Sequence, residues 1–159
     1  MSIVSFLADA AVTGKVADLG LGSRPEKVRG VLGPEGCADR KKKSLRLDYG
    51  LVEFAFYDGL CEGIFIQVHR LLNGPDEVVP DAFRLSFPGI SRTVSFDAVR
   101  SDIEGRGGYY LEGLRAQTGY RHYRIAGSAV VLIVNDEPAR DAEQLAAGDL
   151  WSIQISAAG

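Results

Sequence analysis

The stretch Leu45–Arg70 constrains the fold more than any other part of the chain. It reads as three short segments separated by two turns, and polar and apolar residues alternate within each segment. Val52, Phe54 and Phe56 share one face of the middle segment, which places their neighbours on the other face. The dipeptide Asp58-Gly59 favours a tight turn because both residues tolerate positive φ. The stretch therefore predicts three antiparallel strands that bury one face in the core.

The composition fits a single globular domain spanning residues 1–159. Hydrophobic residues make up 46% of the chain and charged residues 25%, so it can bury a core without metal or disulfide support. The formal net charge of −3 argues against a dedicated nucleic-acid binder, which usually carries a strongly basic face. No segment approaches the roughly 18 consecutive apolar residues of a membrane span.

The N-terminus and the cysteines indicate a cytoplasmic protein. The first residues lack the basic segment of a signal peptide, and Asp9 interrupts their apolar run. Disulfides are rare in a reducing compartment, so Cys37 and Cys61 are expected as free thiols. The sequence alone leaves open whether these two cysteines pair.

Three helices are predicted by capping residues that precede apolar stripes. The second has the S-x-x-E capping box, in which Ser23 and Glu26 each satisfy a backbone N–H at the helix start. Its buried stripe is expected to contain Val28, Val31 and Leu32. The three helices begin after Ser2, Ser23 and Ser95 and end at Gly14, Gly33 and Gly105.

Two segments of the first half are expected to lie outside the sheet. Gly36–Ser44 contains the basic run Arg40–Lys43 and is interpreted as a loop. The third strand is expected to continue through His69. Leu72–Ile90 is rich in proline, glycine and aspartate, which indicates a connection, with Arg84–Phe87 as a short extended piece.

Four strands are expected in the second half. Ser128–Asn135 is an uninterrupted apolar run, which is typical of a strand buried on both faces. In the last strand, alternation places Trp151 on the same side as Ile153 and Ile155. The expected strands are Tyr109–Leu114, Tyr120–Ala126, Ser128–Asn135 and Leu150–Ser156.

The two halves of the chain show a loose internal repeat. The predicted fold is α+β, with two tandem helix-plus-antiparallel-strand units that share a largely antiparallel sheet and carry helices on one face. One such unit is too small to bury its apolar face alone. Coincidence is the alternative, because any α+β chain gives some matches. The units are residues 15–72 and 93–157, joined by 73–92, and the matched segments are Ser23–Gly33 with Ser95–Gly105, 49–58 with 126–136, and 66–68 with 153–155.

Residues 19–33, LGLGSRPEKVRGVLG, carry a resemblance to a known group of proteins. They resemble the helix-opening signature hydrophobic-x-x-Gly-x-Thr/Ser-x-x-x-Val-x-x-x-x-Gly of the β-lactamase inhibitor protein and of small outer-membrane assembly lipoproteins. In that inhibitor a helix-and-strands unit occurs twice, and the joint sheet forms a concave protein-binding face. Those proteins are exported and have a disulfide pattern that this chain lacks, so the inhibitory function itself is not carried over. Residues 48–54 and 66–71 are also similar to a block in uncharacterised cytoplasmic bacterial proteins.

The sequence contains no pattern that predicts a metal, a cofactor or a catalytic residue. His69, His122, Cys37 and Cys61 lack metal-ligand spacing such as C-x₂-C or H-x₃-H. Cys61 with a histidine is a conceivable nucleophile–base pair, but a lone cysteine is usually a small buried hydrophobe. The glycines at 20 and 22 lack the rest of a phosphate loop.

Charged residues among the predicted strands have both functional and ordinary interpretations. Glu53 is expected opposite the apolar face of its strand, and paired carboxylates can perform acid–base chemistry. Surface solvation explains the same residues. The basic run Arg40–Lys43 attracts phosphate or an acidic partner, or is simply a solvated loop. The carboxylates concerned are Asp48, Glu53, Asp58 and Glu62.

The segment around 120–124 is the strongest candidate for a partner-binding surface. Tyrosine and arginine are enriched at interface hot spots because they bury area and still form hydrogen bonds. On a strand, Tyr120, His122 and Arg124 share one face. Ordinary cross-strand packing is the alternative. The candidate residues are Tyr120, Arg121, His122, Tyr123, Arg124 and Tyr109.

These patterns favour a non-enzymatic module that binds another protein through an exposed sheet face, in concrete form an immunity or inhibitor protein that neutralises a toxin or enzyme. The alternative is a small-molecule-binding or enzymatic α+β domain with a pocket on the sheet, lined by Tyr120, His122 or Glu53. Nucleic-acid binding through Arg40–Lys43, Arg121 and Arg124 fits the acidic charge balance poorly. Homodimerisation through open sheet edges is left open by the sequence.

Overall fold

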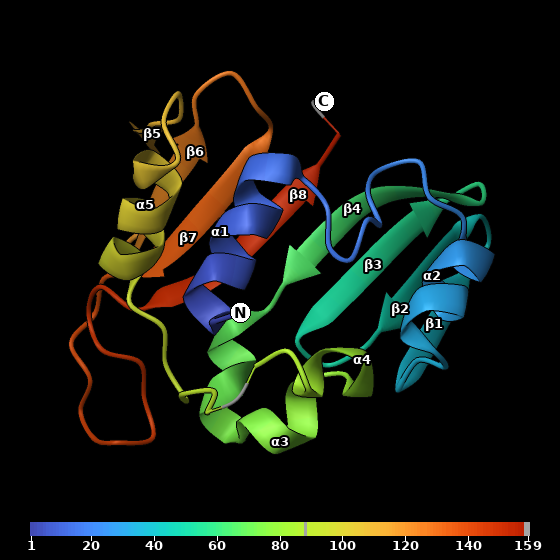
Figure 1. Cartoon of the computed structure of the whole chain (residues 1–159), viewed down its shortest axis with the longest axis horizontal. Coiled ribbons are helices and arrows are strands. Elements are labelled where there is room, and N and C mark those ends of the chain that lie inside the picture. The colour runs from blue at the N-terminus through green and yellow to red at the C-terminus, as the bar shows by residue number, and fades with distance from the viewer. Residues whose placement is uncertain (88, 158–159) are drawn as a thin grey trace.

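The computed structural model describes residues 1–87 and 89–157 and contains one eight-stranded antiparallel sheet with helices (Figure 1). The strand order is β1-β2-β3-β4-β8-β7-β6-β5. The strands are β1 (Cys37–Lys41), β2 (Ser44–Asp48), β3 (Val52–Tyr57), β4 (Leu60–Ile66), β5 (Leu111–Leu114), β6 (Tyr120–Ile125), β7 (Val130–Asn135) and β8 (Leu150–Ser156). The helices are α1 (Ile3–Thr13), α2 (Pro25–Leu32), η1 (Val68–Asn73), α3 (Pro75–Val78), α4 (Asp81–Arg84) and α5 (Phe96–Gly105).

The sheet consists of two four-stranded meanders joined between β4 and β8. Each strand from β1 to β4 pairs with its neighbour in sequence, as does each from β5 to β8. At the junction Ile64 pairs with Ile155 and Ile66 with Ile153, and all four side chains are buried. The α+β class with an antiparallel sheet is therefore confirmed. The sequence correspondence between the halves stays a prediction.

The long helices lie on one face of the sheet (Figure 1). Helix α1 packs on α5 and contacts β7 and β8, while α2 lies over the strands of the first half. Two predicted caps are confirmed: Ser2 Oγ accepts the Ser5 N–H at 3.0 Å, and Ser95 Oγ accepts the Ala98 N–H at 3.4 Å. The apolar stripes of α1 and α5 thus face the same core as Phe54 of the sheet.

The predicted start of α2 is wrong in detail. Arg24 is the N-cap, and Ser23 Oγ instead accepts the Gly20 N–H at 3.2 Å, which stabilises the turn before the helix. Val28 and Leu32 are buried as expected, but Val31 is 45% exposed. A helix of this length buries one narrow stripe of side chains against the sheet. Val31, the other residue predicted for the core, lies outside this stripe and faces solvent.

The loop predicted at 36–44 is largely a β-hairpin. Strand β1 pairs with β2 around a turn in which Lys42 has φ 56°. All five residues of β1 are exposed, so the segment has no apolar alternation from which a strand could be predicted. The basic run therefore lies at the tip of an edge hairpin.

The predicted connection between the halves contains short helices. Strand β4 ends at Ile66 and the chain turns into η1, so His69 is not in a strand as expected. The extended piece predicted at Arg84–Phe87 is also wrong, because Arg84 ends α4. Short helices rich in proline and charge lack the periodicity that would distinguish them from loops.

Two predictions about the faces of the second-half strands are wrong. Val131 and Ile133 of β7 are only half-buried, because none of the helices among residues 1–87 and 89–157 covers them on that face of the sheet. A bulge in β8 leaves Trp151 without a partner on β7, so it turns away from Ile153 to the opposite face.

In the described part of the chain, no helix combines the length and apolarity that a membrane crossing requires.

Candidate functional site

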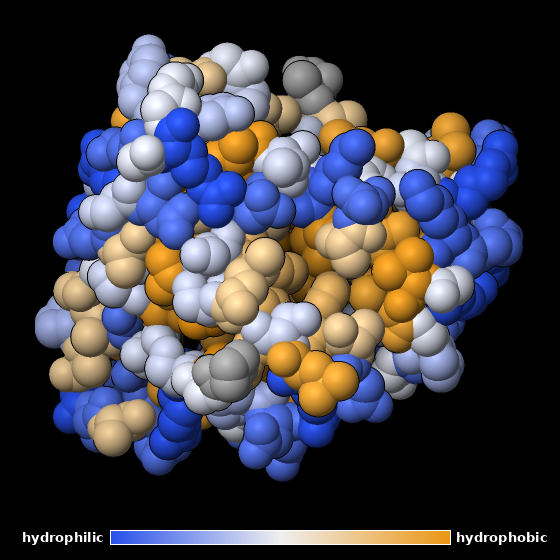
Figure 2. Space-filling model, viewed as in Figure 1, coloured by the Kyte–Doolittle hydropathy of each residue, from blue (hydrophilic) through white to orange (hydrophobic). Residues whose placement is uncertain are grey.

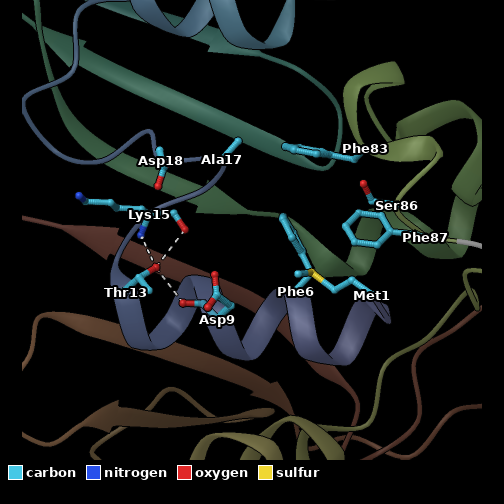
Figure 3. A pocket seen from close by; sticks show the side chains of 10 residues that line it. All are labelled: Met1, Phe6, Asp9, Thr13, Lys15, Ala17, Asp18, Phe83, Ser86 and Phe87. Carbon is cyan, nitrogen blue, oxygen red and sulfur yellow. Dashed lines mark hydrogen bonds between the residues drawn. The ribbon is translucent and has the colours of Figure 1, made fainter.

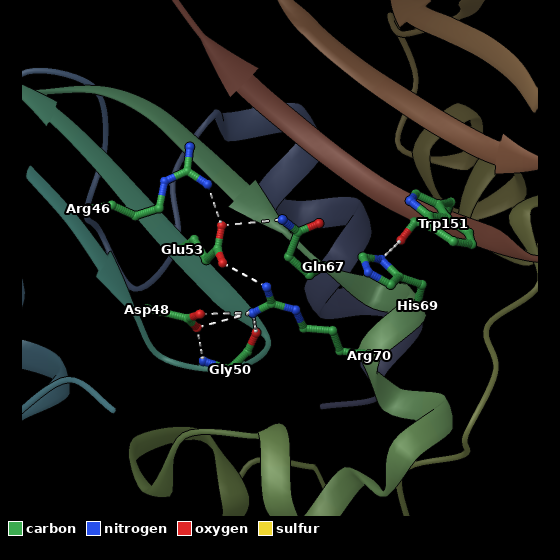
Figure 4. Close-up of polar contacts among 8 residues, drawn as sticks. All are labelled: Arg46, Asp48, Gly50, Glu53, Gln67, His69, Arg70 and Trp151. Carbon is green, nitrogen blue, oxygen red and sulfur yellow. Dashed lines mark hydrogen bonds and ion pairs between the residues drawn. The ribbon is translucent and has the colours of Figure 1, made fainter. Parts of the chain in front are cut away.

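The candidate site is the sheet face opposite α1, α2 and α5, which we call the open face. Figure 4 shows it from the front, with α1 behind the strands. The strand register aligns a row of side chains across it, because directly paired residues point the same way. In order from β2 to β5 this row is Asp48, Glu53, Phe65, Gln154, Val131, Arg124 and Glu112.

The middle of the open face is apolar. Phe65 and Val131 lie in the row just described, and Ile133 lies in the next row between Ser152 and His122. All three apolar side chains are half-buried only by their neighbours on the sheet. A solvated face of an antiparallel sheet usually carries polar residues at such positions. This face therefore has the apolar centre that is typical of a contact surface.

One end of the open face carries a cluster of ion pairs, which we call the ionic end (Figure 4). Glu53 is 4% exposed. It accepts hydrogen bonds from Arg46 Nη1 at 2.9 Å and Arg70 Nη2 at 2.7 Å. Arg70 also binds Asp48 and the carbonyl oxygen of Gly50. The cluster ties η1 to β2 and β3, and the arginines satisfy the buried carboxylate.

The other side of the face carries three rings in contact, which we call the aromatic corner. His69 stacks on Trp151 with centroids 4.3 Å apart and planes 7° apart. Tyr120 meets Trp151 edge-on at 5.3 Å. The rings come from η1, β8 and β6, so three distant segments fix their positions.

The hydrogen bond of His69 defines its chemistry. Its Nδ1 lies 3.2 Å from the Trp151 carbonyl oxygen, which can only accept, so Nδ1 carries the proton and Nε2 is left as an acceptor. Burial lowers the pKa of His69 below its ordinary value, although the Trp151 carbonyl acts in the opposite direction. His69 is therefore a neutral imidazole at neutral pH.

A cavity of about 570 Å³, which we call the corner cavity, adjoins the aromatic corner. Its floor includes the three rings, and its wall is the loop between β7 and β8, represented by Glu137 and Arg140. Asn135 holds this loop, because its amide nitrogen donates to the carbonyl oxygens of residues 137, 145 and 146 at 2.9, 3.1 and 3.0 Å. The volume suits a small ligand or one large side chain.

The predicted partner-binding residues are divided between the two faces. Tyr120, His122 and Arg124 lie on the open face. Tyr123 lies on the helix face, stacked on Phe96 with centroids 4.6 Å apart. Arg121 is on that face too and donates to the Tyr123 hydroxyl at 3.0 Å.

Tyr109 precedes β5 and is 38% exposed. At this edge of the open face Arg124 pairs with Glu112 at 2.8 Å. The charged side chains at both borders of the open face are thus paired within the chain.

The two cysteines do not pair: Cys37 is exposed and Cys61 is buried. Burial raises the pKa of the Cys61 thiol to about 11, so it stays protonated at neutral pH, which argues against a nucleophile. Within residues 1–87 and 89–157, no three metal-ligating side chains cluster in a way that would hold an ion.

A second hollow lies on the helix face, where Figure 2 shows apolar surface beside α1. It measures about 490 Å³ (Figure 3). Phe6 of α1 packs there against Phe83 and Phe87, with centroids 5.3 and 4.8 Å apart. Asp9 and Lys15 border the hollow. Its three aromatic rings thus already pack α1 against α4 and the residues that follow α4.

Three residues of the site were not predicted from the sequence: Phe65, His69 and Trp151. The alternation of its strand predicts that Phe65 lies on the polar face. An apolar residue on a polar face is the signal that could have identified Phe65 as part of the site. His69 and Trp151 are 82 residues apart and give no local signal.

No protein-family model matches the chain, and searches of curated proteins and of solved structures gave no match either. The resemblance to the β-lactamase inhibitor protein stays a prediction.

Proposed function

We propose that this protein is a non-enzymatic module that binds another protein through the open face of its sheet. The observation that carries the proposal is the apolar centre of that face, at Phe65, Val131 and Ile133, on the side without the long helices. In its concrete form the module is an immunity or inhibitor protein that blocks a toxin or enzyme. It acts in the cytoplasm of a bacterial cell.

The arrangement of charges supports the same proposal. The borders carry the ion pairs of Glu53 with Arg46 and Arg70, and of Arg124 with Glu112. Because these charges are already paired, a partner can cover the apolar centre without leaving an unpaired charge buried. Burial of the centre then supplies the main driving force, at roughly 25 cal/mol per Å² of apolar surface.

The test is capture by tagged protein from native cells, followed by reconstitution with the purified partner. Val131→Lys places a charge in the apolar centre, and we expect at least a tenfold loss of affinity. Val31→Lys, on the exposed side of α2, is the matched control and should bind normally. Equal binding by both variants would exclude the open face as the contact surface.

The corner cavity favours a second candidate, a small-molecule-binding or enzymatic domain. Tyr120 lines the cavity, as that alternative predicts, and His69 joins it. Glu53 is instead fully engaged with two arginines. Saturable binding of a free metabolite together with normal partner capture by Val131→Lys would favour this candidate over the first.

A further inference from the structure

Several hydrogen-bond acceptors line the corner cavity. Two are the carboxylates of Glu137 and Glu143, which lie in the lining with the guanidinium of Arg140, and Glu143 pairs with Arg92 at 3.8 Å. The neutral imidazole of His69 adds the free Nε2 acceptor. Asn135 is 8% exposed and lines the cavity. Its nitrogen is used by the loop, and no described residue donates to its Oδ1.

Hydrogen bonds hold the backbone at Glu137, and the Glu137 side chain has no cationic partner among the described residues. Its carbonyl oxygen accepts from Asn135 at 2.9 Å, and the preceding N–H donates to Gly119 at 2.9 Å. Its side chain lies directly over Gly119, since a Cβ built there would lie 2.8 Å from Glu137 Oε1. No ion pair to Glu137 occurs in the part of the chain that the structure describes.

The unpaired carboxylate of Glu137 and the aromatic floor together favour a planar cation. A guanidinium forms two parallel hydrogen bonds to a carboxylate and lies flat against aromatic rings. An anion would instead face Glu137, Glu143 and the Asn135 oxygen. Arg92 pairs with Glu143 at 3.8 Å, so Glu137 is the carboxylate of the cavity that has no ion pair among the described residues.

We propose that the corner cavity binds an arginine side chain of the protein that covers the open face. This inference rests on the proposed function only for the source of the arginine. The cavity adjoins the apolar centre through Trp151 and Ser152, so one bound protein reaches both. The arginine then serves as an anchor that fixes the orientation of the partner on the sheet.

The test uses the fluorescence of Trp151, the only tryptophan in the chain. Three probes are titrated: N-acetylarginine methylamide, its neutral isostere N-acetylcitrulline methylamide, and N-acetylglutamate methylamide. We expect saturation by the arginine probe with a dissociation constant on the order of 1 mM, as for a ligand of this size. The citrulline probe should bind at least fivefold more weakly, and the glutamate probe should not saturate.

Glu137→Gln keeps the shape of the side chain and should weaken the arginine probe at least fivefold. Glu26→Gln is the matched control and should bind normally, because Glu26 is an exposed carboxylate on α2 with no ion pair to any residue that the structure describes. Three outcomes would overturn the inference: equal binding of the arginine and citrulline probes, unchanged binding of the arginine probe by Glu137→Gln, or no saturation by any probe.

The failure of this inference and that of the proposed function can be distinguished. Val131→Lys should lose the partner protein but keep the arginine probe, because Val131 does not line the cavity. Normal partner binding by Val131→Lys would refute the open face while leaving the cavity result intact. If Val131→Lys no longer bound the arginine probe, the cavity and the apolar centre would not be independent binding sites.

Discussion

The carboxylates at the ionic end and at the corner cavity differ in burial and in ion pairing. At the ionic end, Glu53 is buried and two arginines of the same chain satisfy it. At the cavity, Glu137 is exposed, its side chain lies over Gly119, its backbone is held by Asn135, and it lacks such a partner among the described residues. The first carboxylate is used to hold the fold together. The second is left free to bind, which is the property expected of a recognition site.

The largest expected effect comes from breaking the ionic end. Glu53→Ala leaves Arg46 without its carboxylate, leaves Arg70 with Asp48 alone, and removes the link between η1 and β3. We expect a loss of about 3 kcal/mol in the free energy of unfolding, at the low end for buried pairs because Arg46 and Arg70 are partly exposed and can hydrate. Denaturant unfolding followed by circular dichroism measures it. A loss below about 1 kcal/mol would show that the cluster is not structural.

Asn135→Ala should have the next largest effect, because it releases the loop of the cavity. The variant loses the hydrogen bonds to three carbonyl oxygens, of which one is buried and two are partly buried, so water can replace the amide only in part. We therefore expect about 2 kcal/mol of destabilisation. The arginine probe should also bind several-fold more weakly. Stability loss with unchanged probe binding would contradict the role of Asn135 in shaping the cavity.

A smaller effect is expected from the titration of His69. Its pKa is lowered in the folded protein, so the unfolded chain binds the proton more readily. Its contribution to stability is therefore complete above the ordinary histidine pKa of about 6.5 and is lost as the pH falls through the folded value. The charged or titratable groups around it are Arg70, Glu53, Tyr120, Glu137, Arg140 and Glu143.

Unfolding experiments at several pH values between 5 and 8 measure this effect. Trp151 fluorescence should also change with pH, because the ring of His69 stacks on it. His69→Gln should remove the pH dependence of both signals in this range. A fluorescence midpoint above the ordinary histidine pKa would contradict the burial of the imidazole.

The smallest effect is expected at the opposite border, where Glu112→Ala removes the partner of Arg124. Both side chains are more than a third exposed, so solvent screens the pair and we expect less than about 1 kcal/mol. The same unfolding experiment, run beside Glu53→Ala, gives the comparison directly. Equal losses at the two positions would show that burial does not separate the two kinds of ion pair.

The fold was predictable where local signals are strong. Strand β8 begins at Leu150 and ends at Ser156 as predicted, because apolar residues alternate along it. Helix α5 follows the Ser95 cap for the same kind of local reason. Strand β1 could not be predicted, since an exposed edge strand has no apolar face. The short helices after Ile66 are likewise set by tertiary contacts rather than by periodicity.

The candidate site was predictable only in part. The alternation of 120–124 correctly places Tyr120, His122 and Arg124 on one face. The aromatic corner requires His69 and Trp151 to meet across the sheet, and no local pattern encodes such a contact. Trp151 also breaks the alternation of its own strand, so period-two reasoning assigns it to the wrong face.

The bulge in β8 shows how a recognition surface can arise by changing chain length instead of residue type. Removing one residue at the bulge would restore the strict alternation of side chains between the two faces along β8. The indole of Trp151 would then lie on the core face. The aromatic corner would then be lost, although all side chains except that of the removed residue were kept. Two chains with the same core pattern can therefore differ in what they recognise through a single inserted residue.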